Sequence, residues 1–360
     1  MDKEETEDLN KALKADSEYF DAPGLSSSDI NRFAASPSYY HKYSGKGDTS
    51  ATILGNAIHK ACLQPKLFKH VYAHTTSKVS AKLGKYVETL ASAWVPGIEL
   101  RTAKEIAYIA SGFEYPQERV EAIFSKDPKA TEYLEFIKKN RGRIILSSED
   151  YERVNRCKGS INSHKKAVEL LSWIDKGTSE DGEIEVIVEE PIFWVLELKD
   201  GRQVLCKSKP DLTVIFHETK HVINVDLKSS GHRLNSFQHI IEKWGYHRQQ
   251  GFYSEAVNSK LWQDKRIKKR KNGLYADRYS KESYIIAVET ETALNETRVY
   301  HLNEHQLNCS LKECVDYANE IQWHEQNNLW DYPRWYYEGD GSEELTLYDE
   351  QGLKLKSEYN

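Results

Sequence analysis

The spacing of apolar residues divides the chain into helical and extended segments. Between Thr52 and Leu63 apolar residues recur every three or four positions, as in a helix with one buried face, and residues 236–259 repeat this period. Residues 80–175 mix charged and apolar positions with only three prolines, which predicts mostly helices. The serine-rich stretch from Gly24 to Asp29 can cap a short helix that ends before Pro37.

After Gly182 the pattern changes to short runs of β-branched and aromatic residues. Two polar turns, one at Asp200-Gly201 and one at 217–221, predict two hairpins. The expected strands are residues 184–188, 192–198, 204–206, 212–216, 222–227, 284–289 and 297–302. Helices on either side of a sheet predict a mixed α/β (α+β) domain.

Composition supports a folded domain and argues against several other classes. The chain has 360 residues, of which 39% are hydrophobic, enough to bury a core. No apolar run approaches the roughly 20 residues of a membrane-spanning helix, and the first residues lack the pattern of a secretory signal. We therefore expect a cytoplasmic protein without membrane association. The five cysteines form no Cys-x-x-Cys pair, so they suggest neither a zinc nor an iron–sulfur site.

The net charge of -6 is concentrated at the two ends of the chain. Residues 1–21 hold eight acids and three lysines, and residues 338–360 hold seven acids and two lysines. The remaining residues carry 45 bases and 41 acids, a net charge of +4. We therefore expect a solvated acidic extension at 1–21, a main domain at 22–325, and an aromatic and acidic tail at 326–360, whose aromatic residues serve either as an interface or as core packing.

One internal segment, residues 260–271, is strongly basic. It contains seven lysines and arginines and a single acid, Asp264. Both a solvated loop that turns at Asn272-Gly273 and an arm that contacts phosphates fit this composition.

The candidate chemistry lies in Asp211, Asp226 and Lys228. If residues 211–226 form a hairpin centred between Glu218 and Thr219, the two aspartates face each other and can share one cation. Lys228 follows Asp226 by two residues, so the two side chains lie on the same face of the strand. Carboxylates without thiolates favour Mg²⁺ or Mn²⁺. Alone, this spacing also fits a surface hairpin with opposed charges.

Six motifs in order carry a family resemblance. They are Gly24-Leu25-Ser26-x-Ser28 with Ser36-Pro37-x-x-Tyr40, Leu54-Gly55-x-Ala57-x-His59-x-x-x-Leu63-x-Pro65, Glu189-x-x-Ile192-Phe193-Trp194, Lys209-Pro210-Asp211, Asp226-x-Lys228-Ser229-Ser230 and Gln249-x-x-x-Tyr253. Over about residues 22–290 the chain resembles the nuclease domain of prophage exonuclease VIII (RecE-like), within the PD-(D/E)xK superfamily that includes the RecB nuclease domain.

This resemblance implies both a fold and an activity. The implied fold is a restriction-endonuclease-like core, with a central mixed sheet flanked by helices. The implied activity is Mg²⁺-dependent 5′ to 3′ degradation of linear double-stranded DNA from its ends. The resemblance also implies a homo-oligomeric ring around the DNA and transfer of the 3′ single strand to a RecT-like annealing protein.

The resemblance assigns roles by position. Asp211 and Asp226 correspond to metal ligands, together with His59 and the backbone carbonyl of Leu227, and Lys228 corresponds to the catalytic lysine. Glu189 completes or adjusts the metal site, and Gln249 and Tyr253 orient the DNA or the attacking water.

The chain departs from the family pattern at a few positions. Lys209 stands where the family usually has arginine, Gln64 replaces an acid, and Gln250 makes the position of the motif glutamine ambiguous by one residue. A simple hairpin centred on Asp200-Gly201 places Glu189 opposite Leu212 and on the wrong face. For the Glu189 side chain to face the site, a bulge near Pro191 or Pro210 is needed; otherwise Glu190 takes its role.

Three alternatives to the exonuclease remain open on the sequence. The first is a structure-specific or single-strand nuclease on the same core. The second is a DNA-binding or interaction module that has kept the fold without catalysis, and the third is a structural phage protein.

Overall fold

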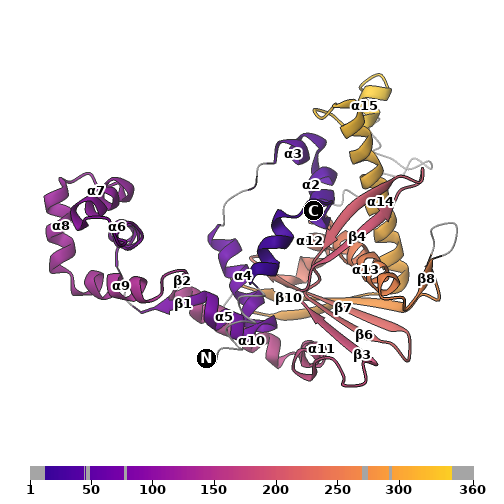
Figure 1. Cartoon of the computed structure of the whole chain (residues 1–360), viewed down its shortest axis with the longest axis horizontal. Helices are drawn as coiled ribbons and strands as arrows, with labels where there is room; N and C mark the ends of the chain where they lie inside the picture. The colour runs from indigo at the N-terminus through magenta and orange to yellow at the C-terminus, as the bar shows by residue number, and fades with distance from the viewer. Residues whose placement is uncertain are drawn as a thin grey trace.

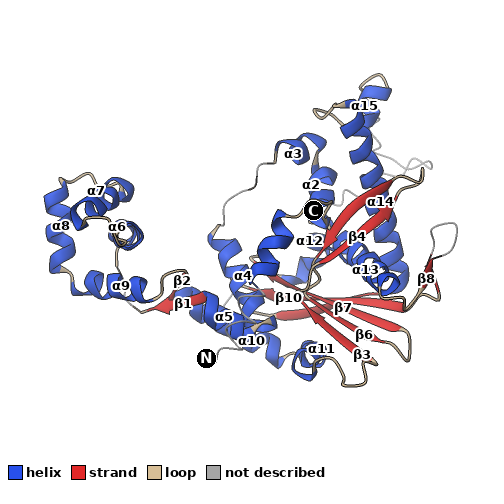
Figure 2. Ribbon diagram, viewed as in Figure 1, coloured by secondary structure: helices blue, strands red, loops and turns tan. Residues whose placement is uncertain are grey.

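The chain folds as a mixed α+β domain, as the sequence predicts, with a five-stranded sheet between two layers of helices (Figure 1, Figure 2). This computed structural model describes residues 13–43, 45, 49–76, 79–269, 275–291 and 294–342.

The central sheet has the strand order β11-β10-β7-β6-β3. The strands β7 and β10 run parallel, and the other neighbouring pairs are antiparallel. The bounds are β3 Ile184–Val188, β6 Leu212–Phe216, β7 His221–Ser230, β10 Ser280–Glu289 and β11 Thr297–Leu302. Each strand covers a run of β-branched and aromatic residues that the sequence marks as extended, because such side chains pack well on a pleated surface.

One long antiparallel hairpin runs through two sheets. Its outer half, β4 (Ile192–Glu197) and β5 (Gln203–Ser208), forms a separate two-stranded sheet closed by a three-residue turn, Lys199-Asp200-Gly201, where the sequence predicted a turn centred on Asp200-Gly201. The β4–β5 pairs continue the register of the β3–β6 pairs, but the backbone turns away at Glu189, whose φ is 54°. The outer half therefore leaves the central sheet.

Helices cover both faces of the sheet. The helices α2 (Ser27–Ala35), α13 (Tyr246–Gln263) and α14 (Glu304–Asn327) pack with Val222 on one face, and α4 (Ser50–Leu63), α10 (Ser148–Ser163) and α11 (Lys165–Lys176) pack with Val225 and Leu227 on the other. The alternation of side chains along β7 accounts for this division. The remaining helices of the body are short: α3 Pro37–Lys42, α5 Pro65–Val71, η1 Leu234–Ser236, α12 Phe237–Lys243 and α15 Arg334–Glu338.

Four helices project from the body as a lobe with a core of its own (Figure 1). They are α6 Ala81–Ala93, α7 Leu100–Ser111, α8 Gln117–Lys126 and α9 Pro128–Lys139. At the base of the lobe, β1 (Tyr72–Thr75) pairs in parallel with β2 (Ile144–Ser147). The strand β2 lies in a region expected to be mostly helical, and its pairing with the distant β1 is a tertiary contact that the local pattern does not reveal.

The structure corrects the expected boundaries at both ends. Residues 13–21 are helical and pack on the domain through the Tyr19 ring and the Asp16 carboxylate, so this part of the acidic extension is not merely solvated. The expected boundary at residue 325 falls inside α14. Beyond that helix Trp330 stacks on His41, with ring centroids 4.7 Å apart, so this part of the aromatic segment is packing within the domain. Residues 1–12 and 343–360 lie outside the described residues.

The basic segment also differs from a simple loop. Lys260 lies in the last turn of α13, and Lys268–Lys269 (β8) pairs with Tyr275–Ala276 (β9) as a short hairpin. The expected turn at Asn272-Gly273 lies outside the described residues. Among the described helices, none is both long and apolar enough to cross a membrane.

Candidate metal centre and active site

Carboxylates from three neighbouring strands lie in one row across the sheet. Leu212 pairs with Val225, and the β6–β7 ladder keeps the predicted register as far as Phe216 and His221. The same register places Asp211 opposite Asp226, with both side chains on the face covered by α13. Both residues are buried, with 7% and 1% of their surface exposed. The predicted register is therefore confirmed, and it aligns the two aspartates.

Glu189 extends this row onto β3, which corrects one expectation. The β3–β6 register continues to place Glu189 opposite Asp211 rather than Leu212, and the Glu189 backbone N–H donates to the Asp211 carbonyl at 3.1 Å. The bulge expected near Pro191 or Pro210 is not needed, because the turn has three residues, Lys199-Asp200-Gly201, with the Leu198 N–H donating to the Arg202 carbonyl, and this shifts the register by one residue. The positive φ of Glu189 marks the end of the strand. Glu190 is exposed, so Glu189 is the acid at this site.

His59 reaches the row from α4, on the other side of the sheet. Its Nδ1 lies 3.6 Å from the Glu189 carboxylate and its Nε2 lies 3.5 Å from the Asp211 carboxylate. Gly55, one turn earlier, makes this approach possible: a Cβ at Gly55 would lie 2.9 Å from the Ser229 hydroxyl of β7. The Gly55-x-x-x-His59 spacing thus combines close helix packing with delivery of the imidazole.

The backbone of Leu227 opens toward the same point. Because β6 begins at Leu212, it leaves the N–H and the carbonyl of Leu227 without a ladder partner on that side. The N–H donates to Asp211 Oδ2 at 2.6 Å, and the carbonyl oxygen is hydrogen-bonded to the His59 imidazole. The predicted ligands His59, Asp211 and the Leu227 carbonyl therefore lie together.

Lys228 pairs with Asp226 on the same face of β7. Its Nζ lies 3.0 Å from Asp226 Oδ1 and 2.8 Å from Oδ2. The ammonium also lies 5.0 Å from the centre of the Tyr246 ring, within the range of a cation–π contact. Tyr246 is a site residue that the sequence analysis missed, since a tyrosine at the start of a helix carries no distinctive signal.

The neighbouring carboxylates raise the pKa values of several groups in the site. Burial, together with the charges of Asp226 and Glu189, raises the pKa of Asp211 against the opposing charge of His59. Burial lowers the pKa of His59, but Asp211 and Glu189 outweigh burial and raise it overall. For Lys228 burial likewise lowers the pKa, and Asp226 and Asp211 more than compensate. The group therefore holds protons that a bound cation would displace.

The ligand atoms fit a hard divalent cation. One atom from each of His59, Glu189 and Asp211 lies within 4.8 Å of the others. Two carboxylates and a backbone carbonyl supply the oxygen ligands that hard divalent cations prefer, and the imidazole adds a nitrogen ligand that also suits transition metals. Asp226 is not one of the three, and its carboxylate is bound by Lys228, although the register keeps it opposite Asp211.

Gln249 and Tyr253 share a face of α13, as predicted. The Gln249 side-chain amide donates to the Tyr253 hydroxyl at 2.8 Å. Burial and the charge of Asp226 raise the pKa of Tyr253, so its hydroxyl lies within the field of the carboxylate row. The neighbouring Gln250 instead accepts a hydrogen bond from Ser283 in the core, at 2.5 Å. Gln249 is therefore the glutamine on the side of the site.

Two lysines and an aspartate complete the surroundings, and of these the sequence analysis noted only Lys209. Lys209 forms an ion pair with Glu189 and lies 2.7 Å from Asp16 of the N-terminal helix. Asp16 also lies 3.2 Å from Lys60, the residue after His59. The position of Lys60 beside the motif histidine was an available signal, whereas Asp16 was hidden within the acidic extension.

Two other features do not join this site. Lys260 of the basic segment pairs with Glu185 at 3.0 Å and with Asp264 at 2.7 Å.

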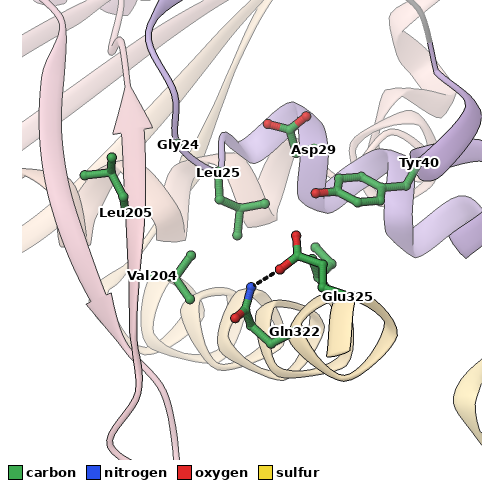
Figure 3. Close-up of a pocket in the computed structure, with 9 residues that line it drawn as sticks. Gly24, Leu25, Asp29, Tyr40, Val204, Leu205, Gln322 and Glu325 are labelled. Atoms are coloured by element: carbon green, nitrogen blue, oxygen red, sulfur yellow. Dashed lines mark hydrogen bonds between the residues drawn. The ribbon is translucent and has the colours of Figure 1, made fainter. Parts of the chain in front are cut away.

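A cavity of about 360 Å³ lies between α2, β5 and α14, where Asp29, Tyr40 and Glu325 converge (Figure 3). Its carboxylates are engaged locally, Asp29 with Ser26 and Glu325 with Gln322, and the metal triad is not part of its lining.

Comparison with known proteins adds a family. Residues 26–332 match the family model described as a "PDDEXK-like domain of unknown function (DUF3799)". No curated protein is found to be similar to the chain.

Among solved structures, a candidate exonuclease from Eubacterium rectale has 12% identity and a TM-score of 0.34, over 81% of this chain and 91% of that one. The protein SSO0001 has 13% identity and a TM-score of 0.23, over 79% and 90%. Both likenesses are too distant to carry an argument about this chain.

Proposed function

Because this chain belongs to the family of PDDEXK-like domains, we propose that it is a nuclease that hydrolyses DNA phosphodiesters with the help of a divalent metal ion. The observation that carries the proposal is the row of Glu189, Asp211 and Asp226 on three adjacent strands, with Lys228 on the same face. A surface hairpin with opposed charges would not bury its acids or receive a histidine from a separate helix.

The residues divide between holding the cation and serving the phosphate. His59, Asp211 and the Leu227 carbonyl, with Glu189 and Asp226 beside them, would hold Mg²⁺ or Mn²⁺. Such an ion polarises a phosphodiester and lowers the pKa of a bound water. Lys228 supplies a positive charge next to the acids, where it can orient a water or stabilise a phosphate oxygen. Tyr253 and Gln249 present a hydroxyl and an amide from α13 to orient the strand.

We further propose that the substrate is linear double-stranded DNA, which is digested from its ends in the 5′ to 3′ direction. This proposal rests on the order of the six motifs and their likeness to RecE-like nucleases. By the same likeness we propose that the remaining 3′ single strand is passed to a RecT-like annealing protein. The chain would act as a homo-oligomeric ring around the duplex.

A single digestion experiment tests the reaction, the direction and the metal. Duplexes labelled at one 5′ end or one 3′ end are incubated with the protein, with and without Mg²⁺, beside a circular duplex and a single strand. We expect mononucleotides from labelled 5′ ends first, only with Mg²⁺, and an intact circle.

The other outcomes separate the alternatives. Cleavage of the circle, or of the single strand alone, would identify a different nuclease on the same core. If every substrate survives with Mg²⁺ and with Mn²⁺, the catalytic proposal is wrong and a binding module remains.

A further inference from the structure

The N-terminal helix, residues 13–21, places an acid between two lysines beside the metal triad. The Asp16 carboxylate lies 2.7 Å from Lys209 Nζ and 3.2 Å from Lys60 Nζ. The side chains of these lysines are only 11% and 17% exposed. Lys209 also forms an ion pair with Glu189, and Lys60 follows His59 on α4. One carboxylate thus bridges two cations at the edge of the candidate active site.

A small set of contacts holds this helix in place. The ammonium of Lys207 on β5 caps the C-terminal end of the helix by donating to the carbonyls of Tyr19, Phe20 and Ala22 at 2.6 to 3.1 Å. The Tyr19 ring lies 6.5 Å from the ring of Phe193, between centroids. The helix therefore contacts the outer hairpin and the site through these polar groups and the Tyr19 ring.

The two lysines suit an anion that arrives from outside the domain. Each of the two ammonium groups binds a different oxygen of the Asp16 carboxylate. The two non-bridging oxygens of a DNA phosphate carry a similar charge at a similar spacing, so they can bind the same pair of lysines. Both lie next to residues that hold the metal, where the strand to be cleaved must pass. The segment that occupies them is itself polyanionic, since residues 1–21 contain eight acids and three lysines.

We propose that Lys60 and Lys209 form a phosphate-binding subsite for the DNA strand beside the metal centre, and that the acidic N-terminal helix occupies this subsite in competition with DNA. The inference rests on the proposed nuclease function and adds to it a substrate contact and an internal competitor. Release of the helix exposes both lysines, and binding of DNA displaces Asp16.

The test compares single substitutions in the full chain. Binding of a fluorescent duplex is followed by anisotropy in EDTA and in Ca²⁺, with electrophoresis to confirm that the duplex stays intact. Asp16→Asn keeps the size of the side chain and removes its charge. Glu18→Gln makes the same charge change on the same helix, at a side chain that is 65% exposed and pairs with Lys14.

We expect Asp16→Asn to tighten duplex binding by about threefold to tenfold, because the competitor loses its charge, while Glu18→Gln changes it less than about twofold. Lys60→Ala should weaken binding by a similar factor and lower the dependence of log K on log salt by about one phosphate contact. In the Lys60→Ala background, Asp16→Asn should have a smaller effect than in the wild-type chain.

Two failures can be told apart. If the wild-type chain binds duplex but Asp16→Asn binds no better than Glu18→Gln, or binds more weakly with a lower melting temperature, the helix is a structural support and the subsite is wrong. If neither the wild-type chain nor Asp16→Asn binds duplex in either buffer, the proposed nuclease function itself fails.

Discussion

Two groups of histidine and carboxylate lie on opposite faces of the same sheet, and they differ in the balance of donors and acceptors. At the candidate metal centre His59 serves Glu189 and Asp211, with Asp226 close by. At the start of β7 and β10 the ratio is reversed, because one acid, Glu282, receives two histidines. His221 Nε2 lies 3.1 Å away and His301 Nε2 lies 2.8 Å away.

The pKa values of the two acids move in opposite directions. Burial raises the pKa of Glu282, but hydrogen bonds from Tyr284, His221 and His301 outweigh burial and lower the pKa overall. The pKa of Asp211 is instead raised, by burial and by its acidic neighbours. Glu282 accepts hydrogen bonds from three side chains, whereas Asp211 lies among other acids that compete for the same few donors. A surplus of buried acceptors, rather than the presence of histidine and acid, is therefore what provides a place for a cation.

The largest expected difference is in catalysis. Asp226→Asn should lower Mg²⁺-dependent hydrolysis of linear duplex by about 10³-fold or more, because it removes a charge from the row without changing its size. The matched change Glu282→Gln removes a carboxylate charge from the other group and should leave the rate within about threefold. Rates are measured with a labelled duplex, and circular dichroism checks that both variants fold. Equal rates for Asp226→Asn and the wild-type chain would refute the assignment.

A smaller difference is expected in metal affinity. His59→Ala should weaken Mn²⁺ binding by about 10-fold to 100-fold, because it removes a ligand and a partner of both acids. His301→Ala should change it by less than about twofold, since Glu282 keeps its other donors. Titration followed by the paramagnetic resonance of free Mn²⁺ measures both. If His301→Ala weakens Mn²⁺ binding more than His59→Ala does, the comparison of the two groups is wrong.

The metal centre should also respond to pH. The raised pKa values of His59 and Asp211 mean that the metal-free site retains protons that the ion must displace. Mn²⁺ binding should therefore tighten as pH rises from 6 to 8, by up to about tenfold per pH unit for each proton released. Calorimetry in buffers of different ionisation enthalpy counts those protons. Affinity that falls over this range would contradict the charge balance derived for the site.

The smallest expected effect is on stability, and it concerns Lys281, a buried lysine that precedes Glu282 on β10. Its Nζ donates to the Ser254 carbonyl at 3.2 Å, and burial lowers its pKa to about 8. The unfolded chain keeps this proton to higher pH, so the free energy of unfolding should rise between pH 8 and the usual lysine pKa of 10.5.

Substitution of this lysine isolates the effect. Lys281→Met should abolish the rise and stabilise the fold at pH 7 by about 1–2 kcal/mol, because it removes a buried charge whose desolvation outweighs the attraction of Glu255 and Glu304. Urea unfolding at pH 7 and pH 10 measures both values. The charge of Lys228, by contrast, is held by Asp226. Loss of stability in Lys281→Met at pH 7 would show that the hydrogen bond to Ser254 outweighs burial.

Local patterns in the sequence were sufficient for most of the fold. The strands of the central sheet and the helix ending at Leu63 follow from the periodicity of apolar residues, and Ser26 caps α2 as the serine-rich start predicts. The register of the second hairpin followed from the polar turn, because the turn fixes which residues oppose each other. That register was enough to align Asp211 with Asp226.

The rest required contacts between distant segments. One exception is local: Glu189 lies opposite Asp211 because the turn has three residues, whereas the sequence analysis assumed a two-residue turn at Asp200-Gly201. The approach of α4 to Ser229, and hence the position of His59, depends on helix packing. The pairing of Asp16 with Lys60 joins residues 44 positions apart.

The sequence by itself therefore determined the element types, the turn-defined pairing and the kinds of side chain available for metal chemistry, since these depend on interactions over a few residues. Only the tertiary structure decided which acid completes the site, how His59 reaches it and what covers its lysines. Those outcomes depend on packing and on the sum of charges around buried groups, and both arise only when separate segments share the same space.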